Sequence, residues 1–352
     1  MRDLDPLDEE LLNRLQADFP VVSEPFAALG ADVGASEADV IERTKRLCER
    51  RVIRQISAIF DTRSLGYQST LVAMKFAPDK LERGARVINQ HPGVSHNYKR
   101  NHEFNLWFTL ATPPGSDIDA TLQALHDLSG AEVTRKLQTL KLFKIGVKLD
   151  MTGEKDITRQ EDPEDTGIQR DFALQSPITE RDVKVIRAVQ DDLPLVPRPF
   201  DACAGSQAMS ESDLFQGMAD LRRRGHLRRV AAILYHRRAG YAANAMAVWA
   251  VPEERAEEVG RRMAEFAAVS HCYQRPVYQD WRYNLFSMIH ARKVDDCERI
   301  VEAIHEATGI GDYTVLYSTK EYKKTRVRYF TEELERWEAE HLGLSRRAQP
   351  VA

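Results

Sequence analysis

The sequence predicts an α+β fold made by tandem duplication, in which each copy is a winged helix-turn-helix followed by a ferredoxin-like βαββαβ sandwich. Two observations predict this fold. Residues of the first half recur in the second half at a nearly constant spacing. In each half, three short helical segments precede strand and helix signals in the order βαββαβ.

The internal repeat covers most of the 352 residues. Phe26 matches Phe200 at an offset of 174 residues and Arg100 matches Arg275 at 175, and the offset then reaches 179 because the second copy inserts four residues after Arg275. A steady offset with small steps indicates duplication rather than chance. Further matches are Gly66 with Gly240, Tyr67 with Tyr241, Phe104 with Tyr283, Phe143 with Tyr322, and Lys144 with Lys323.

The repeat and the local composition divide the chain into six segments. A linker at residues 151–176 is rich in charged residues and lacks apolar periodicity, and a charged tail at 333–352 begins with a short helix. We expect the two winged helix-turn-helix units at residues 1–62 and 177–237. The two sandwiches are expected at residues 63–150 and 238–332.

The helix-turn-helix of the first copy is predicted from apolar spacing and from a cap. Leu11 and Leu15 lie at helical spacing, and Pro20 ends that pattern. Ser36 with Asp39 has the spacing of a capping box at the start of the third helix. Residues 52–60 are then predicted to form a wing or a pair of strands.

The sandwich of the first copy is predicted to have strands at 69–76, 94–99, 104–111 and 141–149, with helices at 78–90 and 117–129. The second copy follows the same order. Its strands are expected at 242–249, 271–273, 283–290 and 322–330, with helices at 252–267 and 295–308.

Composition argues against several classes of protein. The formal net charge is −4, which disfavours a protein that lives on nucleic acid. No run of about 18 apolar residues predicts a membrane span, and the acidic N-terminus does not resemble a secretory signal, so we expect a cytoplasmic protein. Zinc sites and a disulfide framework are not predicted, because no CxxC spacing occurs among Cys48, Cys203, Cys272 and Cys297.

One predicted strand in each copy departs from the expected apolar alternation. After Val94, residues 95–100 offer no aliphatic side chain on either face. A proton donor, a phenol and a guanidinium on one face suit an anionic ligand whose reaction needs a proton. Singly, such residues are usually exposed or pack against neighbours, but here the triplet recurs: His96, Tyr98 and Arg100 in the first copy, and His271, Tyr273 and Arg275 in the second.

The order of the elements resembles the Lrp/AsnC regulators, a likeness of architecture alone. The sequence around the two triplets is more specific, and it resembles the siroheme decarboxylases. Residues 96–108 resemble one subunit type of that family, and residues 270–276 with 280–290 resemble the other. Residues 142–147 and 318–324 agree with the same family. The resemblance implies a fused two-subunit enzyme of haem biosynthesis, in the version that leads to haem d1; the alternative haem pathway stays open.

The resemblance also implies a reaction. Siroheme decarboxylases remove carbon dioxide from the acetate side chains at ring positions 12 and 18 of siroheme, giving 12,18-didecarboxysiroheme. The iron belongs to the substrate, so no cofactor or metal site of the protein's own is expected. The partners expected are therefore siroheme and its product, with no membrane and no specific DNA.

Roles for the polar residues follow from that reaction. Arginine forks match carboxylates, so the candidate substrate-binding residues are Arg100 and Arg275, with supporting charges from Lys144, Lys320 and Lys323. A histidine titrates near neutral pH, so the candidate proton donors are His96 and His271, relayed through Tyr98 and Tyr273. Either histidine could instead ligate the iron of the substrate, and the sequence leaves both roles open.

Two other functions are kept as alternatives. One is a transcription regulator that senses haem or a small ligand. Acidic residues such as Glu37 at the expected recognition helix disfavour it, whereas the arginines at 222–224 and 228–229 favour it. The other is a non-catalytic haem carrier. We expect the two sandwiches to form a pseudo-dimer within the chain, leave further dimerisation open, and favour the second copy as the working site because its longer hairpin could cover a macrocycle.

Overall fold

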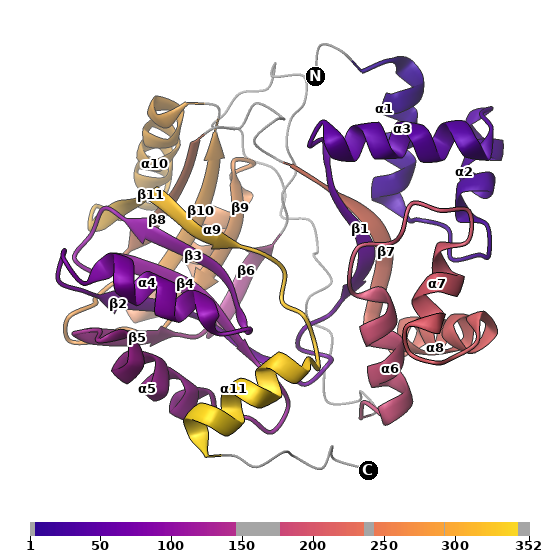
Figure 1. The fold of residues 1–352 in the computed structure, drawn as a ribbon. Helices are drawn as coiled ribbons and strands as arrows, with labels where there is room; N and C mark the ends of the chain where they lie inside the picture. Colours follow the sequence, from indigo (N-terminus) through magenta and orange to yellow (C-terminus); the bar gives the residue numbers. More distant parts are fainter. Residues whose placement is uncertain (1–3, 146–176, 236–242, 292, 344–352) are drawn as a thin grey trace.

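The computed structural model describes residues 4–145, 177–235, 243–291 and 293–343. Figure 1 shows a helical body, formed by the helix-turn-helix parts of both copies, beside a larger body in which helices cover a sheet built by both sandwiches. The predicted linker lies outside the described residues. Within the described ranges, every helix is too short or too polar to cross a bilayer.

The helical body joins both helix-turn-helix units around one apolar core. The first copy contributes α1 (Pro6–Ala17), α2 (Pro25–Val33), α3 (Glu37–Glu49) and β1 (Ile53–Phe60), and the second contributes α6 (Glu180–Val189), α7 (Pro199–Gly205), α8 (Glu211–Arg223) and β7 (Leu227–Leu234). Ser36 caps α3, as its spacing predicts, and Ser210 caps α8 in the same way. Phe19, Phe26 and Phe200 are 1% exposed or less and meet edge to face in the shared core.

The expected wing is a single strand whose partner lies in the other copy. β1 pairs antiparallel with β7 along its whole length, from Ile53 opposite Leu234 to Phe60 opposite Leu227. Phe19 also donates its backbone N–H to the carbonyl of Val230, at 2.7 Å. The alternative that residues 52–60 form a pair of strands is therefore wrong. They form one strand, which pairs with a strand of the other copy.

The two sandwiches follow the predicted order of elements. The first contains β2 (Gln68–Lys75), α4 (Leu81–Gln90), β3 (Val94–Arg100), β4 (Leu106–Thr112), α5 (Ile118–Ser129), β5 (Val133–Leu137) and β6 (Lys141–Ile145). The second contains β8 (Ala243–Trp249), a 3-10 turn (Glu253–Arg255), α9 (Ala256–Glu265), β9 (Val269–Gln274), β10 (Leu285–Ala291), α10 (Val294–Thr308) and β11 (Tyr313–Lys324). β5 was not predicted, because Arg135 and Lys136 interrupt its apolar pattern.

The last strand of the second copy was predicted in the wrong place. It begins at Tyr313 rather than at residue 322, and it ends at Lys324 rather than at residue 330. The apolar residues after Lys324 pack on the helical body instead of continuing the sheet. Tyr329 and Phe330 both contact the ring of Tyr67, at centroid distances of 5.1 and 5.4 Å.

The two sandwiches share one nine-stranded sheet because each lends its last strand to the other. The strand order is β5-β2-β4-β3-β11-β8-β10-β9-β6. The first part of β11 pairs with β8 of its own copy, and the second part pairs with β3 of the first copy. Reciprocally, β6 of the first copy pairs with β9 of the second. The sheet faces that carry no helix meet in a common apolar core that includes Trp107, Phe286 and Leu316.

The longer hairpin of the second copy, between β9 and β10, packs against the first copy at this contact. Trp281, which is 1% exposed, packs edge to face against Phe104 and Trp107 of the first copy. Asp280 forms a bidentate ion pair with Arg135 on β5, at 2.8 and 2.6 Å. The hairpin is thus docked on the first sandwich.

The C-terminal tail begins with a helix, as its sequence predicts. α11 (Glu332–Leu342) packs against α5. Trp337, which is 8% exposed, lies 4.2 Å from the ring of buried His91, and Glu338 accepts a hydrogen bond from Ser116. The tail therefore covers the first sandwich as far as Leu342; residues 344–352 lie outside the described chain.

Candidate functional site

The two polar triplets lie on the sheet faces that point away from the helices. Asn97 donates to the carbonyl of Ala85 on α4, so its neighbours His96, Tyr98 and Arg100 point to the opposite face. In the second copy, the Cys272 thiol lies 3.6 Å from the carbonyl of Gly260 on α9, which places the second triplet on the corresponding face. We call His96, Tyr98 and Arg100 the first strip, and His271, Tyr273 and Arg275 the second strip.

A β-bulge precedes the histidine of each strip. The register of β3 against β4 shifts between Val94 and His96, and that of β9 against β10 shifts between Val269 and His271. The bulge lets the preceding valine remain in the helix-side core, fully buried, while the histidine turns to the other face.

The bulged residue is a serine in both copies, and it fixes the histidine ring. Ser95 Oγ lies 3.0 Å from His96 Nδ1, and Ser270 Oγ lies 2.8 Å from His271 Nδ1. Since this hydrogen bond occupies Nδ1, Nε2 is the ring nitrogen that can act on a ligand.

Both histidines are neutral at pH 7 in the protein without ligand. Burial lowers the pKa of His96 from 6.5 to about 4, and the positive charges of Lys324 and Arg54 act in the same direction. Burial likewise lowers the pKa of His271 to about 4, with a contribution from Arg275. The expectation that these rings titrate near neutrality is therefore wrong for the ligand-free protein.

Each tyrosine lies beside its histidine. The ring centroids of His96 and Tyr98 are 6.4 Å apart, and those of His271 and Tyr273 are 6.1 Å apart. The guanidinium of Arg275 lies 4.7 Å above the Tyr273 ring. Burial raises the pKa of Tyr273, so its phenol keeps its proton at neutral pH.

The two arginines are buried where one copy meets the other. Arg100 is 6% exposed and donates from Nη1 to the carbonyl of Leu316 on β11, at 2.9 Å. Arg275 is 8% exposed and donates from Nη1 to the carbonyl of Leu137 on β5. Burial lowers the pKa of each guanidinium to about 10, so both stay charged.

These buried charges have no carboxylate partner within the described parts of the chain, and both Nε atoms lack a hydrogen-bond partner there. A buried guanidinium without a countercharge is costly. Each strip therefore presents a positive charge that an anionic ligand would compensate.

The three predicted lysines lie on the wrong face to support the strips. Lys144 donates to the carbonyl of Phe266 at the end of α9, and Lys323 donates to the carbonyls of Asn89 and His91 at the end of α4. Lys320 pairs with Glu82 on α4 at 2.8 Å. The prediction that these lysines support substrate binding at the strips does not fit their positions, because bulges in β11 and β6 turn their side chains toward the helices.

Sequence reasoning missed three cations that do lie near the strips. Lys324 stands opposite His96 in the β11–β3 register, and Arg54 donates to the carbonyl of Lys324 at 2.8 Å. Arg63 is close enough to Tyr273 for its charge to oppose the effect of burial on that pKa. The sequence holds one kind of hint: Arg54 and Arg63 align with Arg228 and Arg237 at the offset of 174 residues.

Comparison with known proteins assigns the chain to a family. The siroheme decarboxylase of Hydrogenobacter thermophilus is 42% identical over 330 residues, which cover 94% of this chain and 96% of that protein. The chain belongs to the siroheme decarboxylase family. The family model described as Siroheme decarboxylase NirDL-like HTH domain matches residues 8–54 and 182–228, and the AsnC-like ligand binding domain matches residues 64–144 and 238–323.

Other family members support the fused organisation. The siroheme decarboxylase beta subunit of Methanosarcina barkeri is 48% identical over 147 residues, 42% of this chain and 97% of that subunit. A crystal structure of the siroheme decarboxylase NirDL superposes with a TM-score of 0.75 at 37% identity, covering 96% of this chain and 98% of that one. The same enzyme has been crystallised with an iron-uroporphyrin III analogue.

Within the described residues, no group of three or more histidine, cysteine, aspartate or glutamate side chains could hold a metal ion. In siroheme decarboxylases the iron arrives with the substrate. The groups that could act on such a ligand here are those of the two strips and the neighbouring cations.

Proposed function

We propose that this protein removes carbon dioxide from the acetate side chains at positions 12 and 18 of siroheme, giving 12,18-didecarboxysiroheme for haem d1 synthesis. The observation that carries the proposal is the pair of buried histidine–tyrosine–arginine strips, each holding a guanidinium without a countercharge among the described residues. Family membership supplies the substrate class, and the strips supply the groups that the reaction needs.

The arginines bind the substrate. Arg100 and Arg275 each keep donors beyond the Nη1 bond to a backbone carbonyl, and a carboxylate accepts two such donors in parallel. Placing the carboxylates of a polyanion beside His96 and His271 raises the pKa of both imidazoles. The histidines therefore take up protons as siroheme binds.

The chemical step then needs a proton and an electron sink. The bond between the methylene carbon and the carboxylate carbon breaks, carbon dioxide leaves, and the electron pair stays on the methylene carbon, delocalised into the tetrapyrrole ring. A proton from His96 or His271, directly or through Tyr98 or Tyr273, adds to that carbon and leaves a methyl group.

Iron ligation is the competing role for each histidine. Nε2 is the nitrogen that would bind iron, and it is also the nitrogen that would deliver the proton. Replacing a ligating histidine changes the visible spectrum of bound siroheme. Replacing a proton donor slows turnover and leaves that spectrum unchanged.

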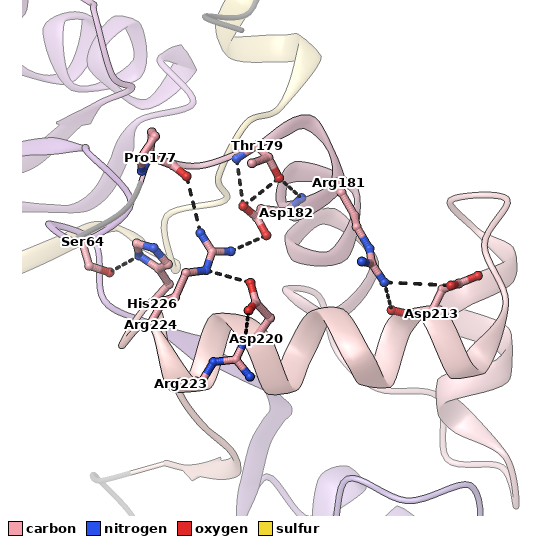
Figure 2. A network of polar contacts seen from close by, with 10 residues as sticks. All are labelled: Ser64, Pro177, Thr179, Arg181, Asp182, Asp213, Asp220, Arg223, Arg224 and His226. Carbon is pink, nitrogen blue, oxygen red and sulfur yellow. Dashed lines mark hydrogen bonds and ion pairs between the residues drawn. The ribbon is translucent and has the colours of Figure 1, made fainter. Parts of the chain in front are cut away.

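The regulator is disfavoured by where the arginines of the second helix-turn-helix are engaged. Figure 2 shows Arg224 bound to Asp182 at 2.5 Å and to Asp220 at 2.8 Å, which ties α8 to α6. The other arginines of the two basic stretches contact Asp18, Asp61, Asp220 and the carbonyl of Ala17.

The start of the recognition helix is also occupied. Glu211, the first residue of α8, accepts a hydrogen bond from Ser23 of the first copy at 2.7 Å and pairs with Arg198. Glu211, one of the residues near the start of the recognition helix that would lie beside the bases, thus faces the other copy.

The decisive test is turnover. Purified protein incubated with siroheme without oxygen should yield a product lighter by two carbon dioxide units, detected by mass spectrometry, with no cofactor added. Siroheme that binds tightly and is recovered unchanged would indicate a carrier instead. His96→Ala and His271→Ala should slow turnover, whereas His126→Ala should not, because His126 bonds Thr134 away from both strips.

A further inference from the structure

A cluster of positive side chains lies beside the first strip. Lys324 stands opposite His96, and Arg54 of β1 bonds the Lys324 carbonyl. Arg326, two residues further on, is half-buried and donates from Nη1 to Ser57 Oγ at 2.6 Å. Ser57 lies on β1, three residues after Arg54. We call Arg54, Lys324 and Arg326 the cation cluster.

The two arginines of the cluster repel each other and are poorly compensated. Burial lowers the pKa of Arg326, Tyr329 opposes that shift, and the charge of Arg54 adds to it, so the two guanidinium groups lie close enough to interact. Neither arginine forms an ion pair with a carboxylate in the described ranges. Glu321 stands opposite Tyr98 in the β11–β3 register.

In the sequence, the positions of this cluster are not all cationic in the other copy. At the matching offsets, Arg54 becomes Arg228, Lys324 becomes Ile145, and Arg326 becomes Val147. Arg228 is held by Asp61, at 2.5 and 3.2 Å. Ile145 stands opposite His271 in the β6–β9 register. The two strips share their own three residues and differ in what surrounds them.

We propose that the cation cluster binds the peripheral carboxylates of a tetrapyrrole polyanion, which makes the first strip the one that takes up substrate. This inference rests on the proposed function, and it reverses the preference for the second copy. An arginine that the protein already holds in place binds a carboxylate better than a solvated lysine does, because the N–H donors of its guanidinium are already oriented. A macrocycle with carboxylates around its rim can reach several cations at once.

Equilibrium binding tests the assignment without turnover. Iron-uroporphyrin III, which carries eight carboxylates, and haem, which carries two, are titrated into the full chain and followed by absorbance. Arg54→Gln and Arg326→Gln should each weaken binding of iron-uroporphyrin III about 10- to 100-fold, the loss expected for a charged hydrogen bond. The loss for haem should be smaller, and Arg54→Lys should recover part of the affinity.

The matched control is Arg228→Gln, which alters the equivalent arginine of the second copy and should bind like the wild type. Arg63→Gln probes the cation nearest the second strip. If Arg63→Gln weakens binding while Arg54→Gln and Arg326→Gln do not, the assignment is overturned in favour of the second strip. Wild-type affinity in all four glutamine variants also overturns it.

Siroheme turnover is measured separately on the same preparations. Suppose that Arg54→Gln and Arg326→Gln weaken binding but the wild-type protein returns siroheme unchanged. That result refutes the proposed decarboxylation and leaves the binding assignment standing. Near-ultraviolet circular dichroism of each variant identifies any that fail to fold. If a glutamine variant fails to fold, the binding affinities of Arg54→Lys and Arg228→Gln are compared instead.

Discussion

Acidification from about pH 7 to pH 5 should tighten siroheme binding, because both strip histidines are neutral in the ligand-free protein. Their pKa values of about 4 must rise when carboxylates arrive beside them. For a histidine that returns to its ordinary pKa of 6.5 in the complex, linkage gives a Kd about 20-fold lower at pH 5 than at pH 7.

The assay is siroheme titration at a series of pH values, with calorimetry in two buffers to count the protons taken up. His96→Gln should abolish most of the pH dependence if the first strip takes the substrate, and His271→Gln should then leave it in place. Affinity that is flat or falls toward pH 5 in the wild type would refute the reasoning, since it would mean that no buried histidine gains a proton on binding.

Folding responds to the same pKa values with the opposite sign. The unfolded histidines bind protons near pH 6.5, whereas the folded ones resist until about pH 4, so the unfolded chain gains protons first. Their contribution to stability is present above pH 6.5 and is lost as the pH falls toward 4, by about 1.4 kcal/mol per pH unit for each histidine. Circular dichroism at pH 5 must therefore accompany the titrations.

Three further predictions concern binding, packing and DNA. Arg100→Ala should weaken siroheme binding by about 1.5–3 kcal/mol, measured by titration, whereas Arg275→Ala, in the strip that does not take up substrate, should weaken it less; unchanged affinity in Arg100→Ala would exclude that arginine as a ligand. Trp281→Ala should lower the free energy of unfolding by about 3–5 kcal/mol in urea, because it empties the core between the copies; a loss below about 1 kcal/mol would contradict that packing. Duplex DNA should bind weakly and lose affinity with salt in gel shifts, and salt-resistant nanomolar binding to one site would restore the regulator.

Local patterns in the sequence were sufficient for much of the fold. The repeat offset located both sandwiches, since duplicated units keep their spacing wherever they pack. Ser36 predicted the start of α3, because an N-cap bonds a backbone N–H three residues away. The absence of aliphatic side chains after Val94 identified the strips, because the alternation of side chains between the two faces is a property of a single strand.

The same local reasoning misplaced Lys144 and Lys323. A β-bulge shifts every following side chain to the other face, and the sequence carries no sign of a bulge in β6 or β11. The final strand was misplaced as well: residues after Lys324 are apolar enough for a strand, but Tyr329 finds its partners in the helical body.

By itself, the sequence determined the duplication, the order of elements and the residues of the two strips, all of which depend on neighbours along the chain. Only the tertiary structure decided which copy completes each site. Arg100 bonds Leu316 on β11, and Arg275 bonds Leu137 on β5, because the two sandwiches pack against each other and exchange their last strands. The same exchange sets Lys324 opposite His96 but Ile145 opposite His271. Contacts between residues far apart in the sequence depend on how two folded units pack, and the periodicity of a local sequence pattern does not encode that packing.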